Sequence, residues 1–355
     1  MQVDAIKDSD KGHWVNRAPL GLRPYLQLSR LDRPVGYWLL ALPGWIGLAF
    51  ASLSHGLALT DLKWAVLILI GAIAMRGAGC TYNDIVDQDL DKQVERTALR
   101  PLPAGTVTTQ QAWAWLFAQC GVGLIVLMCL PRLAQYISLL SIPLVAAYPF
   151  MKRITWFPQL WLGMTFNWAV LVAYAAKTET VSAPLFILYT GLIFWTVGYD
   201  TIYACQDIED DMKIGVKSTA RRFGSRVKLA VGVCYAVCMV FIYIAMSKES
   251  QFEYLPSLEE NLEALKSLKD TSQGWVLYPP LNTDGGRIER YLLIPTYTFL
   301  VFMLPTALHF MRQLYKFNSL NSTSSLKIFK SNFTTGLIMT LSFCALAFVL
   351  GETSI

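Results

Sequence analysis

The most prominent pattern in the chain is a succession of long apolar stretches separated by short polar ones. Apolar runs of about 18 residues or more are typical of helices that cross a membrane. We expect such helices at about 36–54, 62–82, 112–130, 133–150, 158–176, 183–205, 227–246, 291–311 and 332–350. The pattern therefore predicts an all-α, polytopic membrane protein with nine transmembrane helices in one bundle.

The composition agrees with a membrane protein. Hydrophobic residues make up 54% of the 355 residues and charged residues only 15%, whereas soluble domains carry about 25% charged residues. The net charge is +5, but the basic residues lie in loops beside the apolar stretches and form no solvated basic domain. This placement disfavours nucleic-acid binding and makes membrane lipid the expected surroundings.

Basic residues are concentrated in the loops that follow the second, fourth, sixth and eighth expected helices. They are Lys92, Arg96 and Arg100; Lys152 and Arg153; Lys213, Lys217, Arg221, Arg222 and Arg226; and Lys316, Lys327 and Lys330. Loops rich in lysine and arginine stay on the cytoplasmic or matrix side of a membrane. We therefore expect the N-terminus on that side and the C-terminus on the opposite, outer side.

Residues 1–35 form a polar arm ahead of the expected membrane domain, 36–355. Asp4, Asp8 and Asp10 argue against a mitochondrial transit peptide, because such peptides are poor in acidic residues. We therefore expect a multi-pass protein of a bacterial inner membrane, with the mitochondrial inner membrane as the alternative.

One long polar stretch, at about 247–290, interrupts the membrane domain on the outer side. Ser257 and Glu260 have the spacing of a capping box, and leucines follow at helical intervals. We expect a short amphipathic helix of about four turns that lies on the outer membrane face.

The cysteines and histidines offer no metal site. The seven cysteines lie in apolar segments or at their ends without CxxC spacing, and the three histidines are scattered. We expect the cysteines to act as small buried hydrophobic residues.

Two acidic stretches, 83–91 and 200–211, each end a long apolar segment on the basic side. In the first, Asn83, Asp87 and Asp91 are four residues apart, and Asp207 and Asp211 repeat this spacing in the second. Such spacing places side chains on one helix face, where like charges repel. A shared cation would remove the repulsion, and oxygen ligands beside phosphate suit Mg²⁺. The candidate metal ligands are Asn83, Asp84, Asp87, Asp91, Asp207 and Asp211.

Cations near the acidic stretches could hold the phosphate charge that Mg²⁺ leaves uncompensated. The candidates are Arg76, Lys92, Arg96, Arg100, Lys152, Lys217 and Arg221, although any one of them could serve only to set the topology. Metal-assisted loss of diphosphate from an allylic lipid would leave a carbocation, which aromatic faces stabilise. Tyr82, Tyr148, Phe166, Trp168, Tyr199 and Tyr203 are placed for that role, or for packing and interfacial anchoring.

Four stretches together carry a resemblance to a known family. They are Leu31-Asp32-Arg33-Pro34-Val35-Gly36; Met75 to Thr81 leading into Asn83 to Asp91 and Arg96 to Pro101; Tyr148-Pro149-Phe150-Met151-Lys152-Arg153 with Pro158-Gln159; and Gly198 to Tyr203 through Asp207 and Asp211 to Gly224. The chain resembles the UbiA superfamily of intramembrane prenyltransferases, most closely its 4-hydroxybenzoate branch in ubiquinone synthesis. The acids match the family motifs NDxxDxxxD and DxxxD.

The resemblance implies a helical bundle around a central cavity that opens laterally to lipid. It implies Mg²⁺-dependent transfer of a polyprenyl chain from its diphosphate to the ring carbon ortho to the hydroxyl of 4-hydroxybenzoate. Asp200 would then orient the acceptor or assist proton loss. The two acid motifs, with Asn83, Asp87, Asp91, Asp207 and Asp211, would take part in catalysis by holding Mg²⁺ and the diphosphate. Arg30 and Arg33 would bind the acceptor carboxylate, and Tyr203 is a further substrate-binding candidate.

Two departures and three alternatives remain beside this interpretation. Ala169 follows Phe166-Asn167-Trp168 where relatives often have glycine, and Cys205 stands where close relatives often have histidine. Homogentisate, naphthoate or haem are alternative acceptors. An ion-coupled transporter is a second class of function. It is disfavoured because transporter sites tend to lie near the bilayer midplane, whereas the acids of this chain lie at helix ends beside basic loops. A structural protein that binds prenyl lipids is the third.

Overall fold

The structure, a computed structural model, describes residues 12–93, 97–206, 208, 212, 215–252 and 284–352, without the side chains of 250–299 and 351–352. Every regular element in these ranges is a helix. The amphipathic helix expected within 247–290 falls mostly on 253–283, which lies outside the described residues.

The long helices coincide with the expected apolar stretches. Their bounds are α2 Val35–His55, α3 Thr60–Val86, α5 Thr109–Met128, α6 Arg132–Leu140, α7 Ile142–Ile154, α8 Pro158–Thr178, α9 Ala183–Ala204, α12 Val227–Phe252, α14 Asp284–Lys316 and α15 Ser322–Glu352. Seven segments of the described chain are long and apolar enough to cross a membrane. The multi-pass membrane class is therefore confirmed, while α8 and α14 are not among the seven, so the count of nine stays a prediction.

The fourth expected helix is divided into α6 and α7 at Ser141. Pro143 lies in the first turn of α7, where its missing N–H leaves no helical hydrogen bond unmade. The two halves together are still long and apolar enough for one membrane crossing, Arg132–Ile154.

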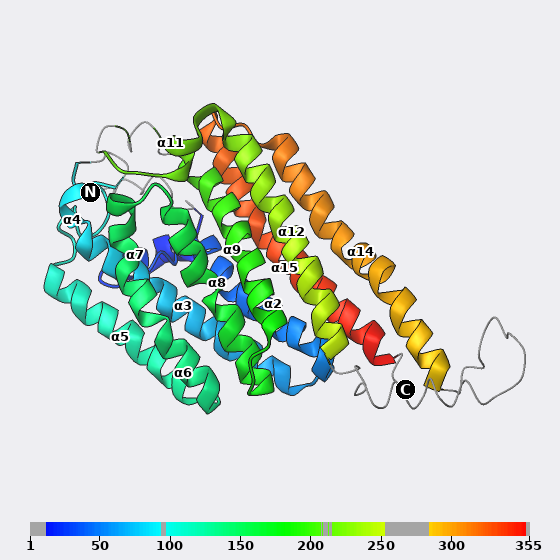
Figure 1. The fold of residues 1–355 in the computed structure, drawn as a ribbon. Helices are drawn as coiled ribbons and strands as arrows, with labels where there is room; N and C mark the ends of the chain where they lie inside the picture. The colour runs from blue at the N-terminus through cyan, green and yellow to red at the C-terminus, as the bar shows by residue number, and fades with distance from the viewer. Residues whose placement is uncertain are drawn as a thin grey trace, which may run out of the picture.

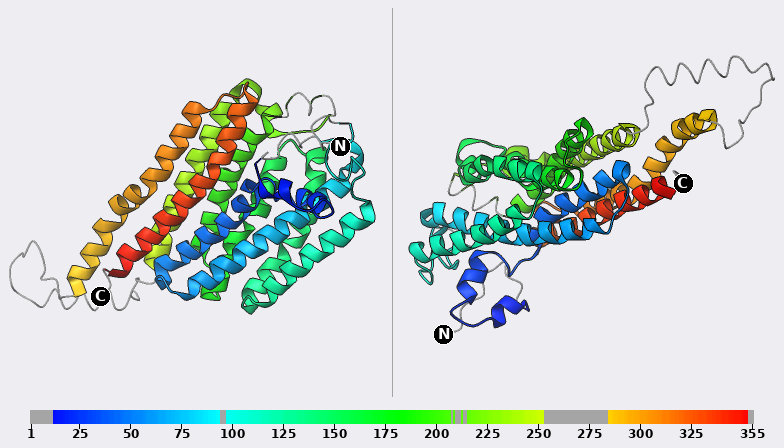
Figure 2. Two further views of the ribbon diagram at one scale, coloured as in Figure 1. Left: turned by 180° about the vertical axis from the view of Figure 1, so that it is seen from behind. Right: turned by 90° about the horizontal axis from the view of Figure 1, so that it is seen from below.

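The helices lie side by side, with their connections gathered at two ends (Figures 1 and 2). The short helices α4 (Gln88–Asp91) and α11 (Thr219–Phe223) share one end with the C-terminal ends of α7 and α9. The end of α12 and the C-terminus lie at the opposite end. The first acidic stretch and the basic loops thus meet at one end of the bundle, as the charge pattern predicts.

The N-terminal arm packs beside this end of the bundle. It contains η1 (Trp14–Arg17) and α1 (Arg23–Leu28). Leu28 is fully buried against Leu102 and Val107, which belong to the loop between α4 and α5. The arm is thereby fastened to the segment that follows the first acidic stretch.

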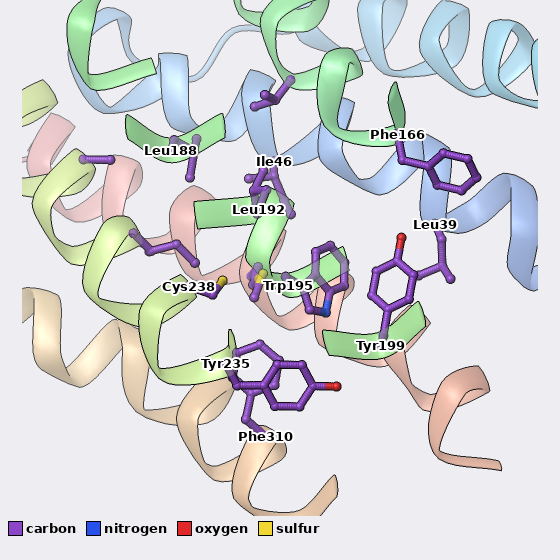
Figure 3. Packing of buried hydrophobic residues seen from close by; sticks show 14 of the residues in the cluster. Leu39, Ile46, Phe166, Leu188, Leu192, Trp195, Tyr199, Tyr235, Cys238 and Phe310 are labelled. Atoms are coloured by element: carbon purple, nitrogen blue, oxygen red, sulfur yellow. The ribbon is translucent and has the colours of Figure 1, made fainter. Parts of the chain in front are cut away.

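The largest buried cluster joins α2, α8, α9, α12 and α15 around Trp195 (Figure 3). The indole N–H of Trp195 donates a 2.9 Å hydrogen bond to the side-chain oxygen of Asn332 on α15. Tyr235 of α12 stacks on Phe310 of α14 with ring centroids 4.0 Å apart. These contacts form a rigid wall behind Tyr199, whose neighbours include Leu39 and Phe166 in Figure 3.

Glycines allow the closest helix contacts in this wall. A Cβ at Gly47 of α2 would lie 2.6 Å from the backbone oxygen of Val170 on α8. A Cβ at Gly198 of α9 would lie 2.6 Å from the ring of Tyr235. Helix backbones can approach this closely only where no side chain intervenes.

Candidate active site

A cavity of about 1100 Å³ is lined by several helices of the bundle and by basic residues at one of its ends. Its body is lined by apolar residues of α2, α3 and α5 to α9, and by the N-terminal part of α15. Most of the polar residues that line it are the expected site residues: Arg30, Arg33, Arg76, Asn83, Asp84, Arg100, Lys152, Asp200, Tyr203 and Lys217. Residues from distant parts of the sequence therefore meet at one chamber.

Not every expected site residue lines this chamber. Asp87 and Asp91 are buried beside it and do not line it. Lys92 is exposed and pairs with the exposed Asp89. Arg96, Asp207 and Asp211 lie outside the described residues, so the role of the second acidic motif rests on the sequence.

The first acidic stretch lies at a helix end. Helix α3 ends at Val86, and the single turn α4 begins after Asp87. The backbone N–H of Asp91 still donates to the carbonyl of Asp87 at 2.8 Å. The chain therefore keeps a nearly helical course, and Asp84, Asp87 and Asp91 are all at most 8% exposed.

Two arginines hold Asp84, which is fully buried. Its Oδ1 lies 2.6 Å from Arg30 and 3.2 Å from Arg100. Arg100 also lies 2.8 Å from Asp91, so one guanidinium bridges both ends of the motif. Buried carboxylates need such partners because an unpaired buried charge is costly.

Asp87 is neutralised by a different pair of cations. Lys152 contacts one of its carboxylate oxygens, and Arg153 lies 2.9 Å from the other. Both cations come from the last turn of α7. The acid thus joins the end of α3 to α7 at the rim of the chamber.

The protonation of this cluster follows from burial and charge. Burial raises the pKa of Asp91, and the neighbouring Arg100 opposes that rise. Burial alone would lower the pKa of Arg30, but Asp84, with further acids nearby, outweighs it and raises that pKa. Arg30 is therefore a permanent positive charge at the chamber rim.

Arg30 also has an unusual backbone. Its φ is +57°, in the left-handed region that non-glycine residues seldom occupy. Such a conformation costs of order 1–3 kcal/mol and persists only where the surroundings enforce it. Here it follows directly after α1 and turns the side chain toward Asp84.

The rim offers side-chain oxygens of the kind that bind a hard cation. The Oδ2 atom of Asp84 is buried and has no hydrogen-bond partner, which leaves a free lone pair for a cation. The adjacent Asn83 lines the cavity, and carboxylate and amide oxygens suit Mg²⁺. Among the described residues no three acidic, histidine or cysteine side chains gather closely enough to hold an ion by themselves.

A buried glutamine fastens the basic loop that follows α9. Gln159 of α8 accepts a hydrogen bond from the backbone N–H of Thr219, at 3.1 Å, and the Thr219 hydroxyl lies 2.6 Å from that of Thr201 on α9. Lys217 donates to the carbonyl of Ile154 at 3.1 Å. These bonds place Lys217 beside Lys152 at the chamber rim.

Aromatic rings line one side of the chamber. Tyr203 and Phe329 have ring centroids 4.5 Å apart, and Tyr199 lies 5.9 Å from Phe329. Phe329 belongs to α15, where the family resemblance is weaker, and sequence reasoning missed it. The apolar pattern of α15 did not distinguish Phe329 from its other apolar residues, because only the packing of α15 against α9 brings this ring to the chamber.

Arg76 lies deeper in the chamber than the acids. It precedes Asp84 by eight residues on α3, which corresponds to about 12 Å along the helix. Its guanidinium lies over the ring of Phe166, 5.1 Å from the centroid, and its buried Nε has no hydrogen-bond partner. A cation in this position can receive an anionic group of a ligand.

The comparisons with known proteins agree with this geometry. The model of the UbiA prenyltransferase family matches residues 40–257, which is more than half of the chain. The fold and the site together define the class: a multi-pass helical membrane protein whose apolar chamber has acidic residues at its rim. The chain belongs to the UbiA prenyltransferase family.

Curated relatives point to one branch of this family. The chain is 48% identical to a human protein named 4-hydroxybenzoate polyprenyltransferase, mitochondrial, over 60% of this chain and 57% of that one. It is 44% identical to the Arabidopsis thaliana protein of the same name, over 59% and 52%. It is 42% identical to 4-hydroxybenzoate geranyltransferase 1 of Lithospermum erythrorhizon, over 67% and 77%. The chain thus spans about half the length of the mitochondrial relatives.

Solved structures share the fold. A UbiA homologue from Aeropyrum pernix matches with a TM-score of 0.56 at 23% identity, covering 89% of this chain and 98% of that one. A homologue from Archaeoglobus fulgidus bound to GPP and Mg²⁺ matches with 0.56 at 18% identity, covering 92% and 99%. The helical arrangement is therefore that of the family.

Proposed function

We propose that this protein transfers a polyprenyl chain from its diphosphate to the ring carbon ortho to the hydroxyl of 4-hydroxybenzoate, as a step of ubiquinone synthesis. The observation that carries the proposal is the chamber itself. Acids and cations gather at its basic end, and its body is apolar. That combination suits a lipid with a charged head, and the names of the relatives supply the acceptor.

The diphosphate is assigned to the rim of the chamber. Mg²⁺ held by Asn83, Asp84, Asp87 and Asp91, together with the sequence candidates Asp207 and Asp211, would neutralise the leaving oxygens. The Archaeoglobus fulgidus homologue solved with GPP and Mg²⁺ supports such a pairing of ligand and metal. Arg100, Lys152 and Lys217, which line the chamber, would hold the remaining negative charge.

The prenyl chain is assigned to the apolar body, with its allylic carbon near the aromatic side. Breaking the bond between that carbon and the diphosphate oxygen leaves a positive charge on the chain. The faces of Tyr203 and Phe329 stabilise that charge, and the apolar walls exclude water that would otherwise capture it.

The acceptor carboxylate is assigned to Arg76. The sequence suggested Arg30 or Arg33, but in the structure Arg30 binds Asp84 at 2.6 Å and Arg33 binds Asp32 at 3.2 Å. The Nε of Arg76 is unpartnered and the residue lines the chamber. Asp200, which also lines it, is assigned to orient the phenol and take up the ring proton after the carbon–carbon bond forms.

The membrane is assigned from the relatives. Several relatives at 44–48% identity carry the word mitochondrial in their names. This favours the mitochondrial inner membrane over the bacterial inner membrane that the acids of the N-terminal arm suggested. Immunogold labelling or membrane fractionation of source cells would decide between the two locations.

Mass spectrometry of reaction products tests the proposal. Purified protein is given a polyprenyl diphosphate with 4-hydroxybenzoate, homogentisate or a hydroxynaphthoate, each with Mg²⁺ or with EDTA. We expect a prenylated 4-hydroxybenzoate and equimolar diphosphate, both only with Mg²⁺. If only homogentisate or the hydroxynaphthoate were prenylated, the protein would belong to a different branch of the family. Absence of diphosphate release with every acceptor would favour a transporter or a lipid-binding protein.

A further inference from the structure

A hydrogen-bond network behind the chamber connects α1, α3 and α5. The side-chain amide of Gln119 on α5 accepts from the hydroxyl of Ser29 at 3.1 Å and donates to the hydroxyl of Thr81 at 3.3 Å. The indole N–H of Trp115 donates to the Ser29 hydroxyl at 2.8 Å. Ser29, Thr81 and Gln119 are at most 8% exposed, so no bulk water competes for these bonds.

The two ends of this network lie next to the two members of an ion pair. Ser29 immediately precedes Arg30, and Thr81 lies three residues before Asp84 on the same face of α3. Arg30 and Asp84 are the pair 2.6 Å apart at the chamber rim. Gln119 therefore fixes the backbone that carries the cation relative to the helix that carries the acid.

Arg30 needs such a restraint because of its backbone. Its φ of +57° is unfavourable for a residue with a side chain. Without the bonds at Ser29, the end of α1 can relax toward an ordinary conformation, and the guanidinium then leaves the position that faces Asp84.

The bundle is also shaped to admit the Gln119 side chain. A Cβ at Gly77 of α3 would lie 1.9 Å from the amide oxygen of Gln119 and 3.1 Å from Cβ of Ser29. Gly77 thus provides the space in which the amide and the serine meet. The contact between Gln119 and Ser29 therefore depends on the close packing of α3, α5 and the N-terminal arm.

We propose that Gln119 is a positioning residue for the prenyl-diphosphate site, acting through Ser29 and Thr81 to hold Arg30 against Asp84. It touches neither substrate and does not line the cavity. Its effect is on the charge geometry of the rim, where Arg30 leaves only the Oδ2 atom of Asp84 free for a cation. The inference rests on the proposed function, because it assigns that rim to a diphosphate.

An amide at this position matches the chemistry of the network. The Thr81 hydroxyl donates to the carbonyl of Gly77 at 2.9 Å, so toward Gln119 it can only accept. The Ser29 hydroxyl accepts from Trp115, and its one proton is within reach of the Gln119 amide oxygen at 3.1 Å and of the Tyr25 carbonyl at 3.0 Å. A side chain with both a donor and an acceptor can bond Thr81 and Ser29 together, whereas methionine has a similar length but no N–H.

The test measures binding of an unreactive donor analogue, geranyl S-thiolodiphosphate, with Mg²⁺ by calorimetry in detergent, and then steady-state kinetics. For Gln119→Met we expect a Kd about tenfold weaker, because displacement of Arg30 disturbs its hydrogen bond to the charged Asp84. The KM for the prenyl diphosphate rises similarly, while the acceptor KM and the melting temperature change little. Gln135→Met is the matched control, since Gln135 bonds the carbonyl of Leu130 away from this rim.

A double-mutant cycle separates positioning from general packing. Once Arg30→Gln has removed the ion pair, Gln119→Met should weaken binding no further. The inference is overturned if Gln119→Met weakens binding of the analogue as much in the Arg30→Gln protein as in the wild type. It is also overturned if Gln119→Met alone leaves the Kd unchanged. Neither result contradicts the proposed prenyl transfer. If Gln119→Met does not fold, Thr81→Val should weaken binding and Thr81→Ser should not, and equal affinities for these two overturn it. A wild-type protein that does not bind the analogue overturns the proposed function, and this inference with it.

Discussion

The guanidinium of Arg100 lies 2.8 Å from a carboxylate oxygen of Asp91, nine residues earlier in the chain. This ion pair folds the loop after the first acidic motif back onto the motif. Because Arg100 also reaches Asp84, the loop is fastened to both ends of the acidic stretch. The acids are therefore held in place before any substrate arrives, as electrostatic preorganisation requires.

The first prediction concerns the acids. Asp84→Asn, Asp87→Asn and Asp91→Asn should each lower kcat/KM by roughly 10²-fold, because each removes charge from the metal and diphosphate site. The sequence predicts the same for Asp207 and Asp211. Steady-state kinetics on variants that keep their elution volume and helical circular dichroism provide the measurement.

Asp89 supplies the matched control for the acids. It lies within the same motif, but its side chain is 94% exposed and, among the described residues, pairs with Lys92 alone. Asp89→Asn should keep near-wild-type activity. If Asp89→Asn were as inactive as the three buried variants, the effect would reflect charge at the membrane surface and not the site.

The second prediction separates the two substrates. Arg76→Leu should raise the acceptor KM at least tenfold and the prenyl-diphosphate KM much less, because a positioned guanidinium binds a carboxylate specifically. Arg33→Ala should change the acceptor KM less than Arg76→Leu does. Kinetics with each substrate varied in turn provide the test, with Arg132→Leu, in the first turn of α6, as control.

The outcome for these arginines decides the orientation of the acceptor. An acceptor KM that is unchanged in Arg76→Leu and raised in Arg33→Ala would return the carboxylate to the rim, where the sequence first placed it. The hydroxyl end of the acceptor, and not its carboxylate, would then lie deeper in the chamber.

The third prediction concerns helix packing. Gly47→Ala should destabilise the protein by about 1–3 kcal/mol, because its Cβ would meet the backbone of Val170, which cannot move aside. Gly121→Ala on α5 should be neutral or stabilising, since nothing lies within 4 Å of its added Cβ. Thermal unfolding in detergent compares the two, and equal melting temperatures would contradict the close approach of α2 and α8.

The fourth prediction concerns the polar stretch between α12 and α14. Replacing residues 253–283 with a short Gly/Ser linker should preserve product formation. The end of α12 and the start of α14 lie at the end of the bundle opposite α4 (Figure 1). Two ends of a membrane-spanning bundle are separated by about a bilayer thickness, ~30 Å. Product analysis on a variant that still inserts into membranes gives the result, and loss of activity there would show that the stretch reaches the chemistry.

The sequence by itself determined the class of protein and the outline of its site. Long apolar runs specify membrane helices because apolar side chains favour lipid, and because a segment in lipid must form its backbone hydrogen bonds within itself. The acids and the basic loops lay next to one another in the sequence, so their common end of the bundle followed from the charge pattern. Most of the expected residues therefore appear at the chamber.

The tertiary structure decided how those charges are shared. The pairing of Arg30 with Asp84 joins residues 54 positions apart, and only the packing of the arm on α3 and α5 brings them together. The same holds for Phe329 on α15 and for Gln119 on α5. Hydrophobic periodicity shows which face of a helix is buried, but not which neighbour covers it, because that depends on contacts between segments distant in the chain.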